Sequence, residues 1–270
     1  MVTVVPSLSS SRGFTLIELI ITLIIGGIVA IVSVSFIGQT GSALVDTGAR
    51  QQLADTAAVI SEQISRRLRQ ALPGSVRTTS DQQCIEFMPV LAATAYTDLE
   101  VAKSITSFTA IPDSATTAVT GYISLYPLSG NLYNPGSSGP LTPDTAVLGA
   151  GSSPVTVTLA SAHRFPTGSP QQRLYVSAAP QAICQSGGWL YWYSGYGFIN
   201  SVAQLQANVP STYSNGRQVL GSGLKAGSLV FRYDPPTLKR NALVTFSFTL
   251  AGDNGDELSM GQEVQVRNVP

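Results

Sequence analysis

The sequence predicts an α+β protein in which one long N-terminal helix precedes an antiparallel β-rich head. Three observations carry this prediction. An uncharged apolar run lies near the N-terminus, and apolar residues then recur at helical spacing. Towards the C-terminus that spacing gives way to strict alternation of apolar and polar residues, which is typical of strands with one buried face.

The first part of the predicted helix is apolar enough to cross a membrane. Residues 19–37 contain no charged side chain, and their polar exceptions are the small hydroxyls of Thr22, Ser33 and Ser35. A side chain of this size can bond back to a carbonyl of the preceding helical turn. At 1.5 Å per residue the run spans about 28 Å, close to the hydrocarbon thickness of a bilayer. We therefore expect a transmembrane helix over residues 14–37.

The second part of the helix is predicted to be an amphipathic stem, over residues 38–73. Apolar residues recur at spacings of three and four: Leu53, Ala57, Ile60, Ile64, Leu68 and Ala71. Charged residues fall between them: Asp55, Glu62, Arg66 and Arg69. Pro73-Gly74 predicts the end of the helix at Leu72, because proline cannot continue it.

Five glycines interrupt this helix: Gly26, Gly27, Gly38, Gly41 and Gly48. Each lowers helix propensity by up to about 1 kcal/mol relative to alanine. They either mark places where the helix can kink or melt, or they allow close packing against other helices. The sequence leaves both readings open.

A short polar leader, residues 1–13, comes before the apolar run. A cleaved secretory signal has the opposite order, with its apolar core before the cleavage site. Residues 13–18 read Gly-Phe-Thr-Leu-Ile-Glu, so Glu18 lies one turn into an apolar helix. A carboxylate there costs on the order of 3 kcal/mol on insertion scales, and we expect it to need a partner.

Residues 13–18 resemble the type III signal of type IV pilins and type II secretion pseudopilins. The resemblance implies that prepilin peptidase cleaves the chain after Gly13 and methylates the new N-terminus, Phe14. It also implies that the Glu18 carboxylate neutralises the terminal ammonium of an adjacent subunit during assembly. The leader departs from the family pattern because Arg12 is its only basic residue.

Residues 36–77 resemble minor pilin-like proteins of the mannose-sensitive haemagglutinin (MSHA) pilus system, most densely at 46–50 and 66–73. This resemblance implies a low-abundance subunit that acts in pilus assembly and initiation. The implied partners are prepilin peptidase, other minor and major pilins contacted through the N-terminal helix, the inner membrane and the pilus assembly platform. The implied location is the inner membrane, crossed once, with the head in the periplasm and on the cell-surface pilus after assembly.

Two other functions fit the same features. The chain could be a J-type pseudopilin of a type II secretion system, or a tip adhesin that binds surfaces or glycans through its head. The second alternative depends on six aromatic residues within ten positions: Trp189, Tyr191, Trp192, Tyr193, Tyr196 and Phe198. They are either core aromatics of a central strand or an exposed stacking platform.

The head is predicted to be one β-rich domain over residues 74–270. Apolar residues alternate with polar ones at Val244, Phe246, Phe248 and Leu250 and again at Val264 and Val266, and residues 253–256 supply the turn of a hairpin. Other predicted strands are 84–90, 122–126, 155–159, 174–177, 189–193 and 229–233. The Gly-, Ser- and Pro-rich stretch 129–145 is predicted to be a surface insertion.

The two cysteines, Cys84 and Cys184, belong to no C-x-x-C pair, which argues against a zinc or thioredoxin-like site. We expect them to form one structural disulfide in an exported head. The Arg66, Arg67 and Arg69 cluster is either a solvated face of the stem or a partner for acidic groups on neighbouring subunits.

Composition argues against several functions. Fifteen basic and fifteen acidic residues balance, so no global field attracts nucleic acid. His163 is the only histidine and no G-x-S-x-G elbow is present, so we expect no catalytic activity. Asp253, Asp256 and Glu257 miss the spacing of a calcium loop, and a hairpin turn explains them. We expect neither a metal nor a cofactor.

Overall fold

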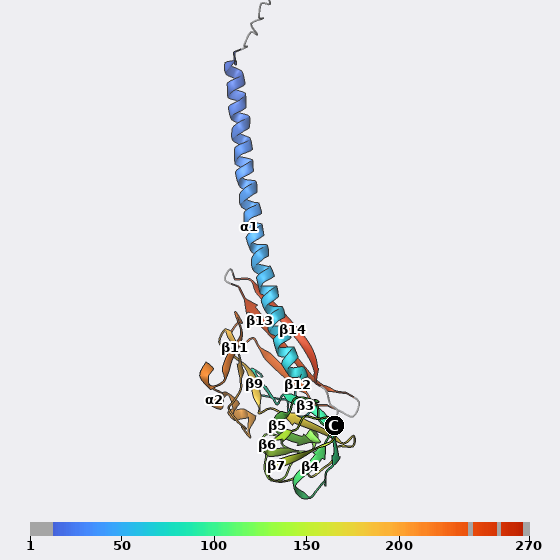
Figure 1. Cartoon of the computed structure of the whole chain (residues 1–270). Coiled ribbons are helices and arrows are strands. Elements are labelled where there is room, and N and C mark those ends of the chain that lie inside the picture. Colours follow the sequence, from blue (N-terminus) through green and yellow to red (C-terminus); the bar gives the residue numbers. More distant parts are fainter. Residues whose placement is uncertain (1–12, 237–239, 253–254, 267–270) are drawn as a thin grey trace, which may run out of the picture. The chain divides into compact units, whose positions relative to one another are not determined.

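The computed structural model describes residues 13–236, 240–252 and 255–266. A long helix, α1 (Leu16–Arg69), is followed by antiparallel sheets, which confirms the predicted α+β class (Figure 1). The chain forms two compact units, Met1–Gln52 and Leu53–Pro270. The apolar part of α1 belongs to the first unit, and its amphipathic end from Leu53 belongs to the second unit together with the β-rich head.

The head contains three sheets, ordered β1-β2-β9-β10-β11, β12-β13-β14 and β6-β5-β8-β3-β4-β7. The strands are β1 (Arg77–Thr78), β2 (Cys84–Phe87), β3 (Val90–Asp98), β4 (Ser104–Ala110), β5 (Val119–Leu125), β6 (Leu141–Leu148), β7 (Val155–Arg164), β8 (Arg173–Ser177), β9 (Gln181–Ser186), β10 (Trp189–Tyr193), β11 (Arg217–Ser222), β12 (Val230–Asp234), β13 (Ala242–Ala251) and β14 (Glu257–Val266). Short helical turns are η1 (Pro127–Ser129), η2 (Val202–Gln204), α2 (Leu205–Asn208) and η3 (Tyr213–Asn215).

Helix α1 begins at Leu16 and ends at Arg69, slightly inside the predicted limits. The earlier end has a physical cause, because the chain after Arg69 pairs with the segment before β3. Val90 N–H donates to the Gln70 carbonyl (2.8 Å), and Leu72 N–H donates to the Met88 carbonyl (2.7 Å). Pro73 therefore follows a segment that has already left the helix.

The predicted apolar face of the stem is the face that packs on the head. Ile60, Ile64 and Leu68 are almost fully buried, and Leu53 is partly buried against the same core. They contact the inner faces of β12, β13 and β14 together with residues of β2, β9, β10 and β11. Each such side chain contributes about 1.5 to 3 kcal/mol through burial, so packing, more than helix propensity, fixes this part of α1.

Strand β11 approaches the helix closely at Gly221. A Cβ atom built there would lie 2.6 Å from both Cγ1 and Cδ1 of Ile60. Since Ile60 is itself buried in the core, only glycine fits without displacing the stem.

The predicted C-terminal hairpin is confirmed. Strands β13 and β14 pair in register, from Ala242 opposite Val266 to Ala251 opposite Glu257. Every second residue of β13 is buried, as the alternation predicts. Asp253 and Asn254 of the predicted turn lie outside the described residues, as do residues 237–239 and 267–270. Within the described part of the turn, Gly252 N–H donates to the Asp256 carbonyl (2.8 Å).

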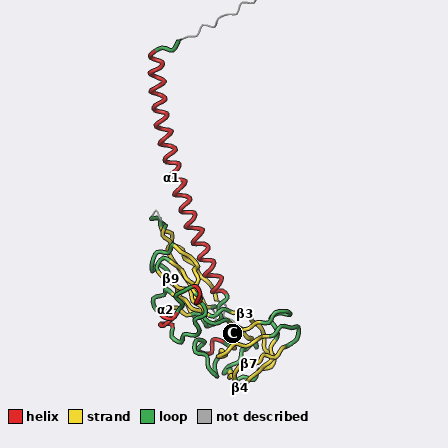
Figure 2. The backbone as a smooth tube through the Cα atoms, turned by 60° about the vertical axis from the view of Figure 1, so that its left-hand side comes forward, coloured by secondary structure: helices red, strands yellow, loops and turns green. Residues whose placement is uncertain are grey.

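Strands β3 to β8 form a second core of their own. Their sheet curls so far that its edge strands, β6 and β7, contact each other, which gives a barrel-like unit (Figures 1 and 2). Its interior holds Phe108, Ile123, Phe165 and Leu174, all buried. In sequence this six-stranded unit lies between β2 and β9, which are paired neighbours. It is therefore an insertion between two adjacent strands of the main sheet.

The prediction of a surface insertion at 129–145 is wrong in part. Leu132, Tyr133 and Leu141 are buried in a small cluster with Leu72 and Tyr175, and β6 begins at Leu141. The glycines, serines and prolines of this stretch make turns around apolar anchors, and the anchors dock the stretch on the head.

Candidate functional site

The segment predicted to be processed lies just before α1. Gly13, Phe14 and Thr15 are exposed and precede the first helical residue, Leu16. The side chain of Phe14 is 71% exposed. The bond between Gly13 and Phe14 is therefore outside the helix and open to solvent in this unit of the chain. A protease needs such an accessible, non-helical peptide bond.

Thr15 and Glu18 form a capping box at the start of α1. The Glu18 N–H donates to Thr15 Oγ1 (3.3 Å), and the Thr15 N–H and hydroxyl donate to Glu18 Oε2 (3.5 and 3.4 Å). The carboxylate also lies in the first turn, where the helix dipole favours negative charge. In the single chain Glu18 thus caps its own helix, while its exposed side chain remains accessible to a second partner.

Among the described residues, α1 is the only helix long and apolar enough to cross a membrane. Its most apolar stretch of 18 residues contains no buried residue. The predicted back-bond is present at Thr22, whose hydroxyl donates to the Leu19 carbonyl (2.9 Å). Cβ atoms built at the five helical glycines, Gly26 to Gly48, meet nothing within 4 Å, so no described residue packs closely enough there to require glycine.

Cys84 and Cys184 are joined by a disulfide. They lie directly opposite each other on β2 and β9, with their Cα atoms 4.2 Å apart. The pair closes a loop of 100 residues that contains the whole six-stranded unit. The disulfide is therefore a clamp at the base of the insertion.

A buried ion pair lies beside this clamp and was not predicted from the sequence. Glu86 on β2 is fully buried, and Arg77 Nε on β1 lies 2.5 Å from Glu86 Oε2. The Tyr196 hydroxyl donates to Glu86 Oε1 (2.9 Å), and the Arg77 guanidinium lies 3.5 Å from the centre of the Tyr133 ring. Arg77 also donates to the carbonyls of Asn200 (2.8 Å) and Ile199. The network ties the main sheet to two surrounding loops.

Burial is the largest influence on the Glu86 carboxyl and raises its pKa, although Arg77 and Tyr196 act in the opposite direction. We expect Glu86→Ala to lower the free energy of unfolding of the head by about 3 kcal/mol, because it leaves Arg77 without its carboxylate. Glu86→Gln should cost clearly less, since its amide keeps the shape and an oxygen acceptor for Tyr196. Urea titration of both variants checks this order, and equal stability of Glu86→Ala and wild type would contradict it.

The aromatic residues of β10 and the following loop are mostly packed into the head. Of the six, Trp189 alone is exposed. Tyr193 is buried, and Phe198 packs edge-to-face on Tyr122 with ring centres 5.0 Å apart. The core interpretation therefore fits this cluster better than an exposed stacking platform.

The other residues considered in the sequence, from which we expect no catalysis and no metal binding, make the following contacts. His163 is buried, and its two ring nitrogens lie 3.0 Å from the carbonyl oxygens of Gly136 and Gly139. Glu257 forms an ion pair with Lys225 (2.8 Å). No group of three candidate ligands for a metal ion occurs in the described ranges, and Asp253 lies outside them. Arg66 and Arg69 are exposed, whereas Arg67 is half-buried.

Comparison with protein families finds one match. The model described as the prokaryotic N-terminal methylation motif matches residues 8–34, which include residues 13–18 and the first part of α1. Comparison with curated proteins and with solved structures gives no match. The motif supports the prediction of a prepilin-type chain, that is, a type IV pilin-like or pseudopilin protein. It implies processing by prepilin peptidase, and with the exposed apolar helix it is consistent with membrane anchoring.

Proposed function

We propose that this chain is a minor subunit of a type IV pilus of the MSHA type, similar to minor pilin-like protein O of that system. In this proposal, residues 1–13 are removed by prepilin peptidase and Phe14 becomes the methylated N-terminus. Residues 14–37 cross the inner membrane, 38–73 form the stem, and the head lies in the periplasm. The assembled subunit acts in pilus initiation through contacts with other minor and major pilins.

One observation carries the proposal. The methylation motif matches residues 8–34, which include Gly13, Phe14 and Glu18, and the apolar residues of α1 from Leu16 to Ile37 are all exposed. A continuous apolar surface of this length needs a bilayer or other helices to cover it. A prepilin uses both in turn, first the membrane and then the helical core of a filament.

Glu18 is the residue that we propose to act when one subunit assembles on another. In a filament its carboxylate would enter an apolar helical bundle, where an unpaired charge costs several kcal/mol. Cleavage after Gly13 creates a terminal ammonium on Phe14 at the same level of a neighbouring subunit. We infer that the two charges pair and so set the position of one subunit against the next.

The proteins that co-purify with the chain distinguish a type IV pilus subunit from a type II secretion pseudopilin. The test is affinity purification of the full-length, tagged chain from detergent-solubilised membranes, followed by identification of the pilin-like proteins that accompany it. We expect subunits of a type IV pilus, and a chain purified from cells without prepilin peptidase serves as the control. Recovery of type II secretion pseudopilins instead would replace the pilus assignment with the pseudopilin one.

The adhesin alternative receives less support, because most of the aromatic cluster on which it depends is packed in the head. The exposed Trp189 alone is a small stacking surface.

A further inference from the structure

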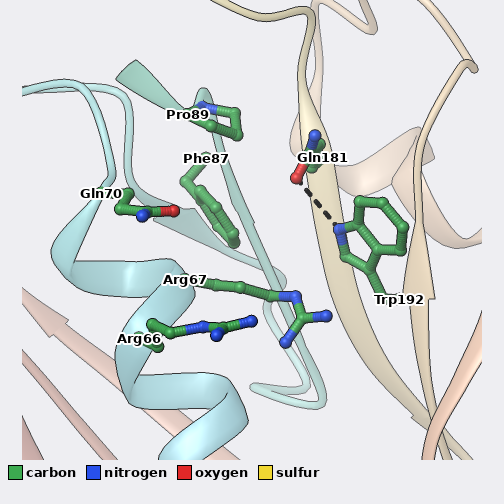
Figure 3. A pocket seen from close by; sticks show the side chains of 7 residues that line it. All are labelled: Arg66, Arg67, Gln70, Phe87, Pro89, Gln181 and Trp192. Atoms are coloured by element: carbon green, nitrogen blue, oxygen red, sulfur yellow. Dashed lines mark hydrogen bonds between the residues drawn. The ribbon is translucent and has the colours of Figure 1, made fainter. Parts of the chain in front are cut away.

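A cleft of about 290 Å³ opens beside the last turns of α1 (Figure 3). It is formed by α1, β2 and the residues after it, β9 and β10. The residues that line it are Arg66, Arg67, Gln70, Phe87, Pro89 and Gln181, with Trp192. Two of them are positively charged, none is acidic, and the rest are amides or apolar rings. The cleft thus combines two guanidinium groups with flat apolar walls.

The guanidinium of Arg67, the half-buried arginine of the cleft, is held in place by its surroundings. Arg67 Nη1 donates to the carbonyl of Gln63 (3.1 Å), and its guanidinium carbon lies 5.5 Å from the centre of the Trp192 ring. Trp192 Nε1–H in turn donates to Gln181 Oε1 (3.0 Å), which fixes the indole. Burial, and then the neighbouring Arg66, lower the pKa of Arg67. Its charge is therefore kept partly away from water, and no carboxylate of the described part of the chain pairs with it.

The guanidinium of Arg66, the exposed arginine of the cleft, has no partner in the residues that the structure describes. Arg66 is exposed, and no hydrogen bond or ion pair to it occurs within those residues. Glu62 stands one turn earlier, at a spacing that allows an ion pair on a helix, yet no such pair is formed there. The partial negative charge of the helix C-terminus favours arginine in this turn, but it does not account for the amide and aromatic walls.

We propose that the Arg66–Arg67 cleft binds a carboxylate side chain presented by a neighbouring pilin-type subunit. Two adjacent guanidiniums can share one carboxylate in charge-assisted hydrogen bonds, which are stronger than neutral ones. Pro89 and Trp192, which are both partly exposed, would cover the aliphatic part of an aspartate or glutamate. The inference rests on the proposed function, since the cleft belongs to the end of the same helix through which the subunits are proposed to assemble.

The test uses the full-length chain and the pilins that co-purify with it. Arg66→Glu should reduce the recovered amount of the partner by about tenfold or more, because it replaces an attraction to the carboxylate by a repulsion. Arg69→Glu is the matched control: Arg69 stands in the same last turn and is exposed, but it does not line this cleft. Within the described residues Arg66 makes no hydrogen bond or ion pair with the head, so Arg66→Glu should keep the wild-type unfolding midpoint.

A charge exchange makes the test specific. A photo-reactive amino acid in place of Gln70, at the wall of the cleft, is expected to cross-link to a partner peptide that contains Asp or Glu. Changing that acidic residue to Lys should restore recovery with Arg66→Glu and reduce it with the wild-type chain.

Equal recovery with wild type, Arg66→Glu and Arg67→Gln would overturn the inference while leaving the proposed function intact. So would a cross-linked peptide without an acidic residue, or failure of the exchange to restore recovery. A wild-type chain that recovers no pilin at all would instead overturn the proposed function, and this inference with it.

Discussion

The double variant Cys84→Ser, Cys184→Ser is expected to lower the free energy of unfolding of the head by about 4 to 5 kcal/mol in the chain-entropy model. The effect is large because the disulfide closes a loop of 100 residues. That loop is a complete six-stranded unit inserted between two paired strands, β2 and β9. Without the bond, unfolding frees the whole insertion from its base.

The full-length chain is unfolded with urea in detergent, and tryptophan fluorescence monitors the transition. Wild-type protein treated with dithiothreitol is the matched control and should approach the double variant. Two titratable free thiols in untreated wild-type protein from the periplasmic side would contradict the structure at this point. An unchanged midpoint in the variant would show that the clamp does not limit the stability of the head.

Glu18→Ala is expected to leave membrane insertion and cleavage intact but to prevent most recruitment of the chain into pilin complexes and to reduce surface piliation. Glu18 caps its own helix in the structure, and we propose that its charge also pairs with a neighbouring subunit, so one substitution removes both contributions. Losing the capping box costs about 0.5 to 2 kcal/mol, whereas burying an unpaired terminal ammonium in the filament costs several kcal/mol. The second effect is the larger, so we expect the loss of the carboxylate charge, more than the loss of the cap, to cause the assembly defect.

Glu18→Gln separates the two roles. Its amide oxygen can still accept from the Thr15 N–H, which keeps the cap, but it carries no charge for the ammonium of Phe14. We expect Glu18→Gln to fail in recruitment almost as fully as Glu18→Ala. Thr15→Val is the reciprocal variant, because it removes the hydroxyl cap and keeps the carboxylate, and it should assemble. Normal recruitment of both Glu18 variants would remove the assembly role assigned to this residue.

Several parts of the fold could be predicted because their signals are local. The apolar face of the stem and the hairpin β13–β14 each follow one periodicity over about ten residues or more. Strand β9 carries no such signal, because Ala182, Ile183 and Cys184 are all buried and no polar residues alternate with them. In β6, Pro143 and Asp144 read as turn residues, and they fall where the register with β5 shifts.

The insertion itself could not be predicted, because it depends on the pairing of β2 with β9 across 100 residues. The candidate site also has a part that local sequence predicts and a part that depends on distant segments. Thr15 and Glu18 stand at the spacing of a capping box, which can be read from the sequence. The burial of Glu86 and the approach of Arg67 to Trp192 arise only when distant segments pack together. In the sequence Arg67 and Trp192 stand more than 100 residues apart, so no local pattern links them to one site.

The most direct test of the central claim is mass spectrometry of the mature N-terminus, with the full-length chain isolated from cells with and without prepilin peptidase. We expect the chain from peptidase-positive cells to begin at Phe14 and to carry one N-methyl group. In peptidase-negative cells residues 1–13 should remain attached. An intact leader in peptidase-positive cells, or a mature N-terminus at any other residue, would contradict the assignment of this chain as a prepilin.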